Sequence, residues 1–493
     1  MNKDIENVFQ ENFIKSMSPA LESHPVQIDN YGTLFINGKF TKANSRKRIK
    51  SINPANEKVL AEFVDANEKD VDSAMVAATK AQVKWAKLPG SERAKYLFKI
   101  ARLIQENSRE LAVLETMDGG KPIKESRDVD LPLVAAHFFY YAGWADKLKY
   151  LATGATVSPV GVCAQVIPWN FPLMMAAWKI APALAAGNTV VIKPAESTSL
   201  SLLKLAELFQ QINLPPGVVN VVTGGGATGA ALISHKLANK AAFTGSTSVG
   251  KQILRANAGK NIKGTMELGG KSANIVFADC AIDQAIEGVV AGIYFNQGHV
   301  CCAGSRLLIQ ESIEQEFLKK LQKRIAQLRV GNPLDKNTDI GAINSKEQLI
   351  TIKKLVANGI EQGCEYYQAE TSKLPTKGYY HQPSYFRGLA SGSTINRVEI
   401  FGPVLAVSTF RTVNEAIIKA NDSRFGLAAG VWTSKPSRVH FLTQKLKAGI
   451  IWTNTYNNFD PTSPFGGFKE SGFGREGGWH GLFPYVNIKG ANK

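Results

Sequence analysis

Two adjacent cysteines, Cys301 and Cys302, lie in a polar, glycine-containing turn that follows a helix-like run, within the stretch from Phe295 to Arg306. A thiolate presented near a helix terminus or a bound charge is a strong nucleophile. A buried cysteine with only a structural role is the alternative, because free cysteine is among the most buried residue types. The turn therefore indicates covalent catalysis if other reactive groups accompany it.

Two further segments supply such groups. Glu267 stands beside two glycines in MELGGKS, and its carboxylate offers a general base. Asn170, in PWNFP at the end of an apolar run, offers a side-chain amide that can stabilise an oxyanion. One nucleophile, one possible base and one oxyanion donor thus lie on three separate segments.

The segment from Ala241 to Gly250 places a glycine-bounded turn between a strand-like run and a helix-like run. The backbone N–H groups of such a turn can bind a phosphate. The segment does not match the GxGxxG fingerprint, and a purely structural turn explains it equally well. Its spacing alone therefore leaves nucleotide binding open.

Lys193 and Glu196 follow the apolar run Thr189–Ile192, at the edge where open parallel sheets bind ligands. A carboxylate there can accept hydrogen bonds from both ribose hydroxyls and would repel a ribose 2′-phosphate. This favours NAD over NADP, although Lys193 acts in the opposite direction. A surface ion pair between the two side chains is the alternative.

A parallel sheet would position all these segments. Short apolar runs, typical of strands buried on both faces, occur at Val160–Ile167, Thr189–Ile192, Val218–Val222, Ala241–Phe243 and Ala273–Phe277. Helix-like segments separate most of them, at Met174–Ala186, Ser199–Ile212 and Gly250–Ala258. The alternation predicts an α/β fold of dinucleotide-binding architecture, followed by a second α/β unit from Cys280 to about residue 460.

Helical patterns also precede the sheet, from Glu68 to Met117 and from Asp130 to Trp144, with a stop signal at 118–122. Residues 1 to about 30 carry a weaker helical pattern, and Tyr485–Lys489 alternates like an exposed strand that could pair with another subunit. Because the 493 residues exceed the roughly 250 to 300 that one core supports, we expect two large domains.

The net charge of +17 raises the question of nucleic-acid binding. The basic residues are spread along the chain without a known binding motif, so we expect no nucleic-acid partner. Five cysteines, an odd number without paired spacing, suggest a reducing compartment. The N-terminus lacks an apolar signal core, and the apolar stretch 173–192 is interrupted by Lys179 and Pro182, so we expect a cytoplasmic protein without a membrane span.

Taken together, the sequence resembles the aldehyde dehydrogenase superfamily from Asn53 to Gly472. The motifs that carry the resemblance occur in the family's order: Pro168–Pro172, Lys193–Glu196, Phe243–Gly250, Glu267–Ser272, Asn296–Arg306 and Glu399–Pro403. It implies a Rossmann-like parallel-sheet cofactor domain (1–139 and 159–266), a second α/β catalytic domain (267–464), and a small β oligomerisation extension (140–158 and 465–493). A homodimer or homotetramer is implied as well.

The resemblance makes Cys301 the nucleophile, because the family's reactive cysteine stands three residues after Gly298, and makes Cys302 a pocket residue. It makes Glu267 the general base and Asn170 the oxyanion donor. Glu476 is either part of the site's proton network or half of a structural ion pair with a lysine. His299 departs from the glutamine or glutamate of many relatives, and we expect its side chain to point away from the nucleophile rather than form a Cys–His dyad.

The resemblance further implies NAD, with NADP less favoured, and no metal ion. The expected cofactor contacts are Ile167, Pro168, Trp169, Lys193, Glu196, Gly226, Gly245, Ser246, Gly250, Leu268, Glu399 and Phe401. The expected substrate tunnel is lined by Phe171, Met175, Trp178, Phe295, Val300, Cys302, Phe459 and Phe465. This apolar lining suits an aliphatic or aromatic aldehyde, while a cationic aldehyde stays open because aromatic faces attract quaternary ammonium groups.

The implied reaction oxidises an aldehyde to a carboxylic acid through a thioester on Cys301, which water activated by Glu267 hydrolyses. Relatives that transfer the acyl group to coenzyme A usually lack a carboxylate at the position of Glu267, so hydrolysis is expected. A catalytically silent relative with a structural or binding role is the alternative, and NADH formation from a simple aldehyde distinguishes the two.

Overall fold

The apolar runs of the middle of the chain form the parallel centre of one sheet in the computed structural model, which describes residues 21–27, 32–370 and 373–490. Its parallel strands are β6 (Val162–Val166), β7 (Thr189–Lys193), β8 (Val219–Val221), β9 (Lys240–Thr244) and β10 (Lys263–Glu267). The first four are fully buried. Strands with helices on both faces need apolar side chains on both sides, which explains why these strands are mostly hydrophobic.

Within the described residues this sheet has eight strands, in the order β2-β1-β8-β7-β6-β9-β10-β20. The outer strands β1 (Thr33–Ile36), β2 (Lys39–Lys42) and β20 (Gly472–Phe473) are antiparallel to their neighbours. The helices that connect its parallel strands are α7 (Pro172–Ala185), α8 (Leu200–Gln211), α9 (Gly226–Ile233) and α10 (Thr247–Asn257). The predicted parallel α/β sheet is confirmed.

The long helical region expected from residue 68 to residue 117 is divided into α2 (Glu68–Lys87), α3 (Gly90–Glu106) and α4 (Ser108–Gly119). The first break is local, because Pro89 forces the preceding Leu88 into an extended conformation. Helix α4 ends at a left-handed Gly120, within the predicted stop signal. A short α5 (Ile123–Glu125) and a π-helical turn (Ser126–Asp130) lead into α6 (Leu131–Trp144). Of the weak helical pattern expected over residues 1 to about 30, residues 1–20 and 28–31 lie outside the described residues, and residues 21–27 form no helix.

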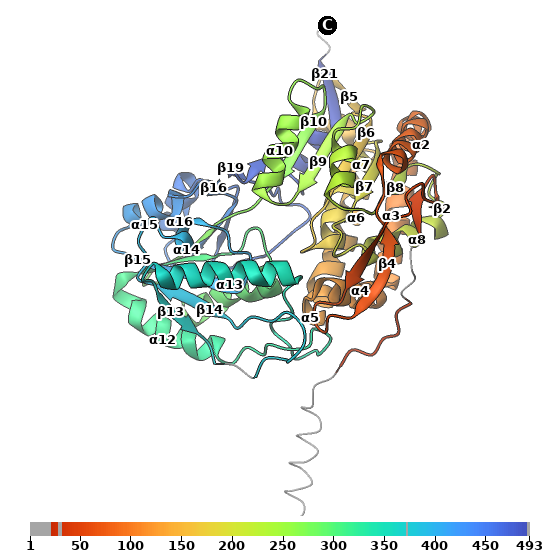
Figure 1. The fold of residues 1–493 in the computed structure, drawn as a ribbon. Helices are drawn as coiled ribbons and strands as arrows, with labels where there is room; N and C mark the ends of the chain where they lie inside the picture. Colours follow the sequence, from red (N-terminus) through yellow and green to blue (C-terminus); the bar gives the residue numbers. More distant parts are fainter. Residues whose placement is uncertain (1–20, 28–31, 371–372, 491–493) are drawn as a thin grey trace, which may run out of the picture.

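The second sheet forms the other lobe (Figure 1). Its seven described strands follow the order β13-β14-β15-β12-β11-β17-β18, and only the pair β13–β14 is antiparallel. They are β11 (Ala273–Val276), β12 (Arg306–Gln310), β13 (Glu365–Gln368), β14 (Ser384–Arg387), β15 (Val404–Phe410), β17 (Ala428–Trp432) and β18 (Ile450–Thr453). The helices of this lobe are α11 (Ile282–Tyr294), α12 (Glu314–Ile325), α13 (Lys346–Glu361), α14 (Thr394–Arg397), α15 (Val413–Asn421) and α16 (Pro436–Lys445). The second α/β unit is therefore also present.

A two-stranded antiparallel ribbon of β5 (Ala155–Pro159) and β21 (Val486–Gly490) extends from the first lobe (Figure 1). Shorter antiparallel pairs are β3 (Arg48–Ile52) with β4 (Val59–Val64), and β16 (Phe425–Gly426) with β19 (Phe468–Lys469). The strand expected at 485–489 is β21. Its partner β5 brings together the two chain segments that the sequence assigned to the extension.

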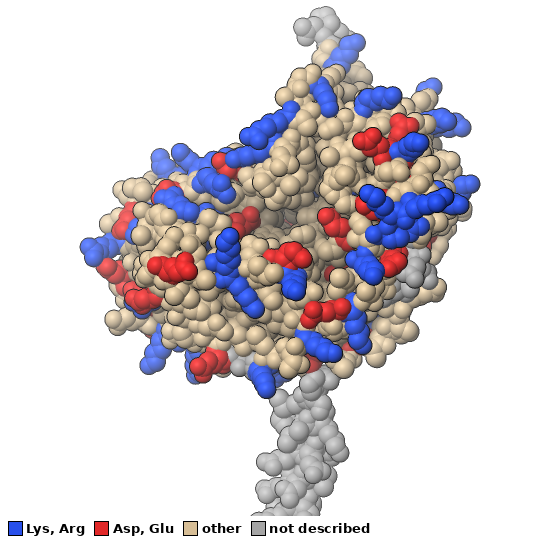
Figure 2. All heavy atoms as spheres, viewed as in Figure 1, with Lys and Arg blue, Asp and Glu red and all other residues tan. Residues whose placement is uncertain are grey.

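The chain passes from the first sheet to the second through the short segment between Glu267, which ends β10, and Ala273, which begins β11. This junction lies between the two lobes, where the surface is hollowed (Figure 2). On the same face, acidic side chains lie among the basic ones, so the positive net charge does not form one continuous patch there. No helix in the described part of the chain is long and apolar enough to cross a membrane.

Candidate active site

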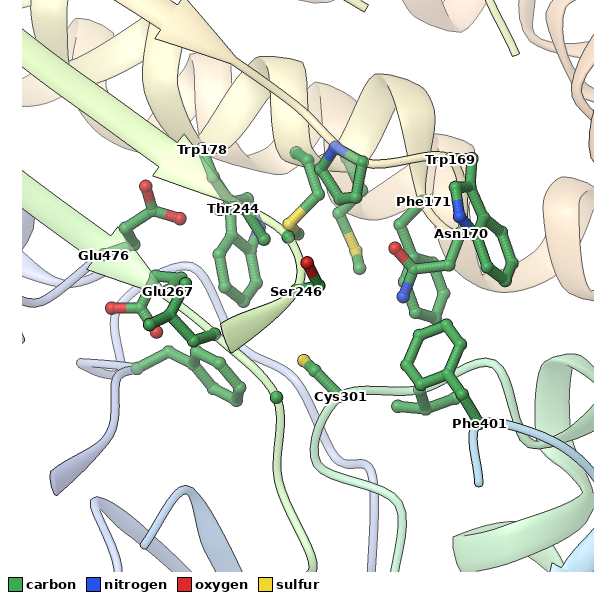
Figure 3. A pocket seen from close by; sticks show the side chains of 18 of the residues that line it. Trp169, Asn170, Phe171, Trp178, Thr244, Ser246, Glu267, Cys301, Phe401 and Glu476 are labelled. Carbon is green, nitrogen blue, oxygen red and sulfur yellow. The ribbon is translucent and has the colours of Figure 1, made fainter. Parts of the chain in front are cut away.

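A cavity of about 230 Å³ lies between the lobes, and its lining is mostly apolar. Both lobes contribute to the lining, which consists of Pro168, Trp169, Asn170, Phe171, Met174, Met175, Trp178, Thr244, Gly245, Ser246, Glu267, Leu268, Gly269, Val300, Cys301, Gln348, Glu399, Phe401, Phe459, Phe465 and Glu476. The three residues expected to do chemistry, Cys301, Glu267 and Asn170, are all among them. Figure 3 shows the Cys301 side chain in the cavity, with Asn170 on one side and Glu267 on the other.

Cys301 follows α11 and a turn in which Asn296 and Gln297 both adopt left-handed backbone conformations, with φ of 48° and 53°. The side chain is half-buried and borders the cavity. Cys302 is fully buried, does not line this cavity, and places its Sγ 3.7 Å from Asn457 Oδ1. Burial and the neighbouring Cys301 raise the pKa of the Cys302 thiol well above its usual value. The geometry therefore favours Cys301 as the nucleophile, since a thiolate is required.

Asn170 lies just before α7, whose first turn begins at Pro172. Its Nδ2 donates to the His299 carbonyl at 2.8 Å, and its own carbonyl accepts from Asn296 Nδ2 at 2.8 Å. The first hydrogen bond joins the side-chain amide of Asn170 to the loop that carries Cys301, and the second joins its backbone carbonyl to the same loop. One of the two N–H bonds of the Asn170 amide is occupied in this way, so the other is available to an oxyanion.

Glu267 ends β10, and its side chain is 3% exposed with neither carboxylate oxygen hydrogen-bonded. Burial, together with repulsion from Glu476, raises the pKa of Glu267 well above its usual value. A buried carboxyl group without hydrogen bonds is free to exchange a proton with water in the cavity. This matches the expected general base.

Glu476 lines the cavity and forms a buried ion pair with Lys179 of α7, at 2.6 Å between Nζ and Oε1. Lys179 Nζ also donates to Thr244 Oγ1 at 2.6 Å. Glu476 is therefore half of the salt bridge that was one of the two interpretations from the sequence, and it also acts on the pKa of Glu267. Its part in a proton network stays a prediction. Lys179 was not predicted as a site residue, because in the sequence it is only a single charged residue within an apolar helical run.

The turn between β9 and α10 faces the cavity through Gly245 and Ser246. Ser246 caps α10 by accepting from Val249 N, and the first backbone N–H groups of a helix lack partners within it. A Cβ at Gly250 would lie 2.5 Å from Leu268, so glycine allows α10 to approach β10 closely. The turn can therefore hold a phosphate group, as the sequence suggested.

Lys193, Glu196 and Gly226 lie at the carboxyl edge of the first sheet but do not line the cavity. Lys193 Nζ is buried and donates to the carbonyls of Pro194 and Gly224, both at 2.6 Å. It lies 3.6 Å from Glu196, whose side chain is 54% exposed. The ion pair weighed as an alternative is thus present, while the exposed carboxylate keeps acceptor capacity for a ligand.

On the second lobe, Glu399 Oε1 accepts from Gly270 N at 3.0 Å, and burial raises the pKa of Glu399 to about 7. Phe401 has a left-handed backbone, with φ of 55°. Gln348 of α13 donates to the carbonyls of Ile400 and Phe401 and so holds this loop. Gln348 lines the cavity and was not predicted, because nothing in the amphipathic pattern of α13 distinguishes it from a surface glutamine.

His299 is buried between aromatic rings, 4.8 Å from Trp169 and 5.8 Å from Phe401 between centroids. Burial lowers the pKa of His299 to about 3, so the ring is neutral at physiological pH. It does not line the cavity beside Cys301. This packing role agrees with the expectation that it forms no Cys–His dyad.

Six of the expected tunnel residues line the cavity, namely Phe171, Met175, Trp178, Val300, Phe459 and Phe465. Phe295 lies behind them, with its ring stacked 6.2 Å from that of Phe171, and Cys302 is buried below the nucleophile. Ile167 and Gly250 are likewise outside the lining. Met174 and Thr244 line it without having been predicted, since each is one residue from a motif position.

All five cysteines are free thiols. Within the described ranges, no group of three or more His, Cys, Asp or Glu side chains is arranged to hold a metal ion.

Comparison with known proteins fits this geometry. The family model described as "Aldehyde dehydrogenase family" matches residues 40–491. The chain is 42% identical to the mitochondrial aldehyde dehydrogenase of Rattus norvegicus, over 96% of this chain and 93% of the relative. It is 41% identical to the mitochondrial benzaldehyde dehydrogenase of Antirrhinum majus, over 94% and 89% of the two chains.

Among solved structures, the NAD⁺ complex of an aldehyde dehydrogenase from Bacillus cereus superimposes with a TM-score of 0.89 at 41% identity, covering 93% of this chain and 95% of that one. An NAD-dependent aldehyde dehydrogenase from Sinorhizobium meliloti gives a TM-score of 0.90 at 34% identity, covering 96% and 97%. These matches extend over both lobes and the cavity between them. The chain belongs to the aldehyde dehydrogenase family.

Proposed function

We propose that Cys301, Glu267 and Asn170 carry out the NAD-dependent oxidation of an aldehyde to a carboxylic acid, the reaction of this family. The observation that supports these roles is their convergence on one cavity from three separate segments, with Cys301 between the amide and the carboxyl group (Figure 3). The expected family, fold class, reaction and use of NAD are confirmed by the comparisons. The assignment of each residue remains our proposal.

In the proposed reaction, the Cys301 thiolate attacks the carbonyl carbon of the aldehyde and forms a carbon–sulfur bond. The Asn170 amide and the backbone N–H of Cys301 stabilise the resulting oxyanion, and loss of one such donor typically costs about 3 to 4 kcal/mol. When bound, NAD accepts the hydride that leaves this adduct. Cys301 then carries a thioester, and Glu267 takes a proton from the water that hydrolyses it.

The binding residues for NAD are proposed from both lobes. Gly245, Ser246 and Gly250 shape the turn for the phosphates, and Lys193 and Glu196 lie where the adenosine ribose would be held. Ile167, Pro168, Trp169, Gly226 and Leu268 border this path, while Glu399 and Phe401 would contact the nicotinamide half. The exposed Glu196 carboxylate supports a preference for NAD over NADP.

The cavity supports an aliphatic or aromatic aldehyde of moderate size as substrate. Its outer part is formed by Trp178, Phe459 and Phe465, with ring centroids 5.1 to 6.3 Å apart. No arginine or lysine lines it, so a second carboxylate on the substrate would lack a partner. A dicarboxylic semialdehyde is therefore disfavoured.

We further propose the domain division given by the sequence: cofactor domain 1–139 and 159–266, catalytic domain 267–464, and bridging segments 140–158 and 465–493. The ribbon of β5 and β21 joins both bridging segments and leaves strand edges for another subunit, which supports a dimer or a tetramer of dimers. Five free thiols support a reducing compartment, and we propose the cytoplasm.

Replacement of each of the two neighbouring cysteines by alanine tests the assignment of the nucleophile. We expect Cys301→Ala to abolish NADH formation from short aliphatic and aromatic aldehydes. Cys302→Ala is the matched control, because it removes an adjacent thiol that does not line the cavity, and it should retain most activity. NADH absorbance measures both variants. Activity near wild type in Cys301→Ala, or its loss only in Cys302→Ala, would contradict the proposal.

A further inference from the structure

Glu125 is a buried carboxyl group that the proposed reaction does not use. It ends the short helix α5 and is 6% exposed. Its Oε2 accepts a hydrogen bond from the backbone N–H of Asn296 at 2.9 Å, across 171 positions of sequence. It therefore connects the first lobe to the loop that carries the nucleophile.

Asn296 in turn holds the oxyanion donor. Its Nδ2 donates to the carbonyl of Asn170 at 2.8 Å, and the Asn170 amide donates to the carbonyl of His299 at 2.8 Å. Glu125 thus holds the backbone of Asn296, and the side chain of Asn296 holds the backbone carbonyl of Asn170. Asn170 is the residue whose side-chain amide is assigned to the oxyanion.

The backbone of this loop needs such support. Asn296 and Gln297 are consecutive left-handed residues without being glycine, a conformation that is unfavourable for L-residues and persists only where the surroundings enforce it. Gln297 is held by Gly341 N and the Ala342 carbonyl, both at 3.1 Å. The carboxyl group of Glu125 holds the backbone N–H of Asn296. Without it, that N–H would be buried with no partner.

We infer that Glu125 is a positioning residue for the oxyanion site, acting through Asn296 on the amide of Asn170. The inference rests on the proposed function, since it assumes that Asn170 stabilises the oxyanion. Nothing in it requires Glu125 to touch the substrate. The proposed role needs only Glu125 Oε2 as a hydrogen-bond acceptor.

The surroundings of Glu125 favour a neutral carboxyl group that accepts a hydrogen bond over a charged carboxylate. Burial raises the pKa of Glu125 to about 8, against the opposing effect of nearby Lys121. Lys121 itself is paired with Asp130 and lies 4.1 Å above the ring of Phe171. The carboxyl group is therefore neutral at pH 7, and a glutamine amide can replace it with the same acceptor.

The test compares two reactions of Cys301 in the full-length enzyme. NADH formation in a single turnover passes through an oxyanion, whereas alkylation by iodoacetamide does not. Removing one oxyanion donor slows turnover about 10²- to 10³-fold, so we expect Glu125→Ala, which displaces the donor, to slow NADH formation about tenfold or more. Alkylation should keep its rate, and Glu125→Gln should restore NADH formation.

Asp118→Ala is the matched control. Asp118 is another buried carboxyl group that accepts from a backbone N–H, that of Leu200 at 2.9 Å, but its partners lie outside the cavity lining. The Asp118→Ala enzyme should unfold more readily than the wild type. Its rate of NADH formation should not fall more than its rate of alkylation. Equal slowing of both Cys301 reactions in Glu125→Ala, or no slowing of either, would overturn the inference.

Combination with Asn170→Ala separates this inference from the proposed function. If Glu125 acts through Asn170, then Glu125→Ala should slow NADH formation only slightly further in the Asn170→Ala enzyme. Fully multiplicative effects would overturn the inference alone. An unchanged rate in Asn170→Ala by itself would overturn both the oxyanion assignment and the inference that depends on it.

Discussion

Glu267 and Glu476 are two buried acids that face the same cavity, and the cations Lys179 and Arg475 both act on Glu267. Glu476 forms the ion pair with Lys179, while Glu267 has no hydrogen-bond partner. Burial and the like charge of Glu476 therefore both raise the pKa of Glu267.

Replacement of the base should separate the two halves of the reaction. We expect Glu267→Gln to retain a burst of NADH close to one equivalent per active site, because attack and hydride loss do not need the carboxylate. Steady turnover should fall about 10²-fold or more, the usual contribution of a general base. Stopped-flow absorbance measures both phases. An unchanged steady rate would contradict the assignment of Glu267.

The pH dependence of thioester hydrolysis has a definite sign. Hydrolysis needs Glu267 deprotonated, so its rate rises with pH through the raised pKa of Glu267. Glu476→Gln removes the like charge beside Glu267. It also removes the charge that neutralises the Lys179 ammonium group. Both changes lower the pKa of Glu267. We expect the rising limb to move to lower pH. A limb that stays in place or moves to higher pH would contradict this.

At the scale of elements, the nucleophile loop packs directly against the loop that precedes β15. Gly298 has a φ of 76°, and a Cβ there would overlap the backbone carbonyl of Gly402. Backbone atoms cannot move aside as a flexible side chain can. The distance between Cys301 and Phe401 is thus fixed by a glycine.

We expect Gly298→Ala to destabilise the fold by about 2 to 5 kcal/mol, from the left-handed conformation and from overpacking. Urea unfolding and titration of reactive thiol measure the effect. Gly143→Ala is the control, because Gly143 lies in α6 with no atom within 4 Å of the added Cβ. That variant should be as stable as the wild type or slightly more stable. Equal stability of the two variants would contradict the argument.

Elements buried on both faces were the most predictable from sequence. Strand β7 was expected at 189–192 and is found at Thr189–Lys193, because the strand is buried throughout and its centre, 190–192, is apolar. Strand β10 was not predicted, since it begins with exposed Lys263 and half-buried Gly264. Its last residue, Glu267, was identified from the motif rather than from the strand.

Site residues defined by a contiguous motif were predictable, whereas supports from distant helices were not. Asn170 and Cys301 each lie in a distinctive local sequence. Glu125 and Lys179 act on residues far along the chain, through contacts that only the packing of helices creates. A single sequence contains no local signal for such a contact.

At the scale of the molecule, the cavity is shared by two lobes, so a ligand that contacts both stabilises the whole chain. We expect NAD at 100 times its Kd to stabilise the folded protein by about 2.7 kcal/mol, and so to raise its melting temperature. NADP at the same concentration should raise it less, because of Glu196. Differential scanning fluorimetry measures both. Equal shifts would contradict the proposed preference.

The prediction for the oligomeric state concerns the ribbon of β5 and β21. We expect light scattering to report a dimer or tetramer for the full chain and for a chain lacking residues 491–493. Removal of residues 487–493 takes away most of β21 and should reduce the assembly to smaller units. A monomeric full chain, or an unchanged assembly after the longer deletion, would contradict the proposed interface.

The pairing of β20 with β10 has a further consequence for how the chain is made. Residues 472–473 complete the edge of a sheet whose other strands all precede residue 268. During synthesis the first lobe therefore emerges from the ribosome long before its last strand, with the backbone edge of β10 unpaired. Such an edge can pair with other nascent chains, so the period between these two events is when the protein is most exposed to aggregation. Chains that terminate before Gly472 would keep this edge open permanently.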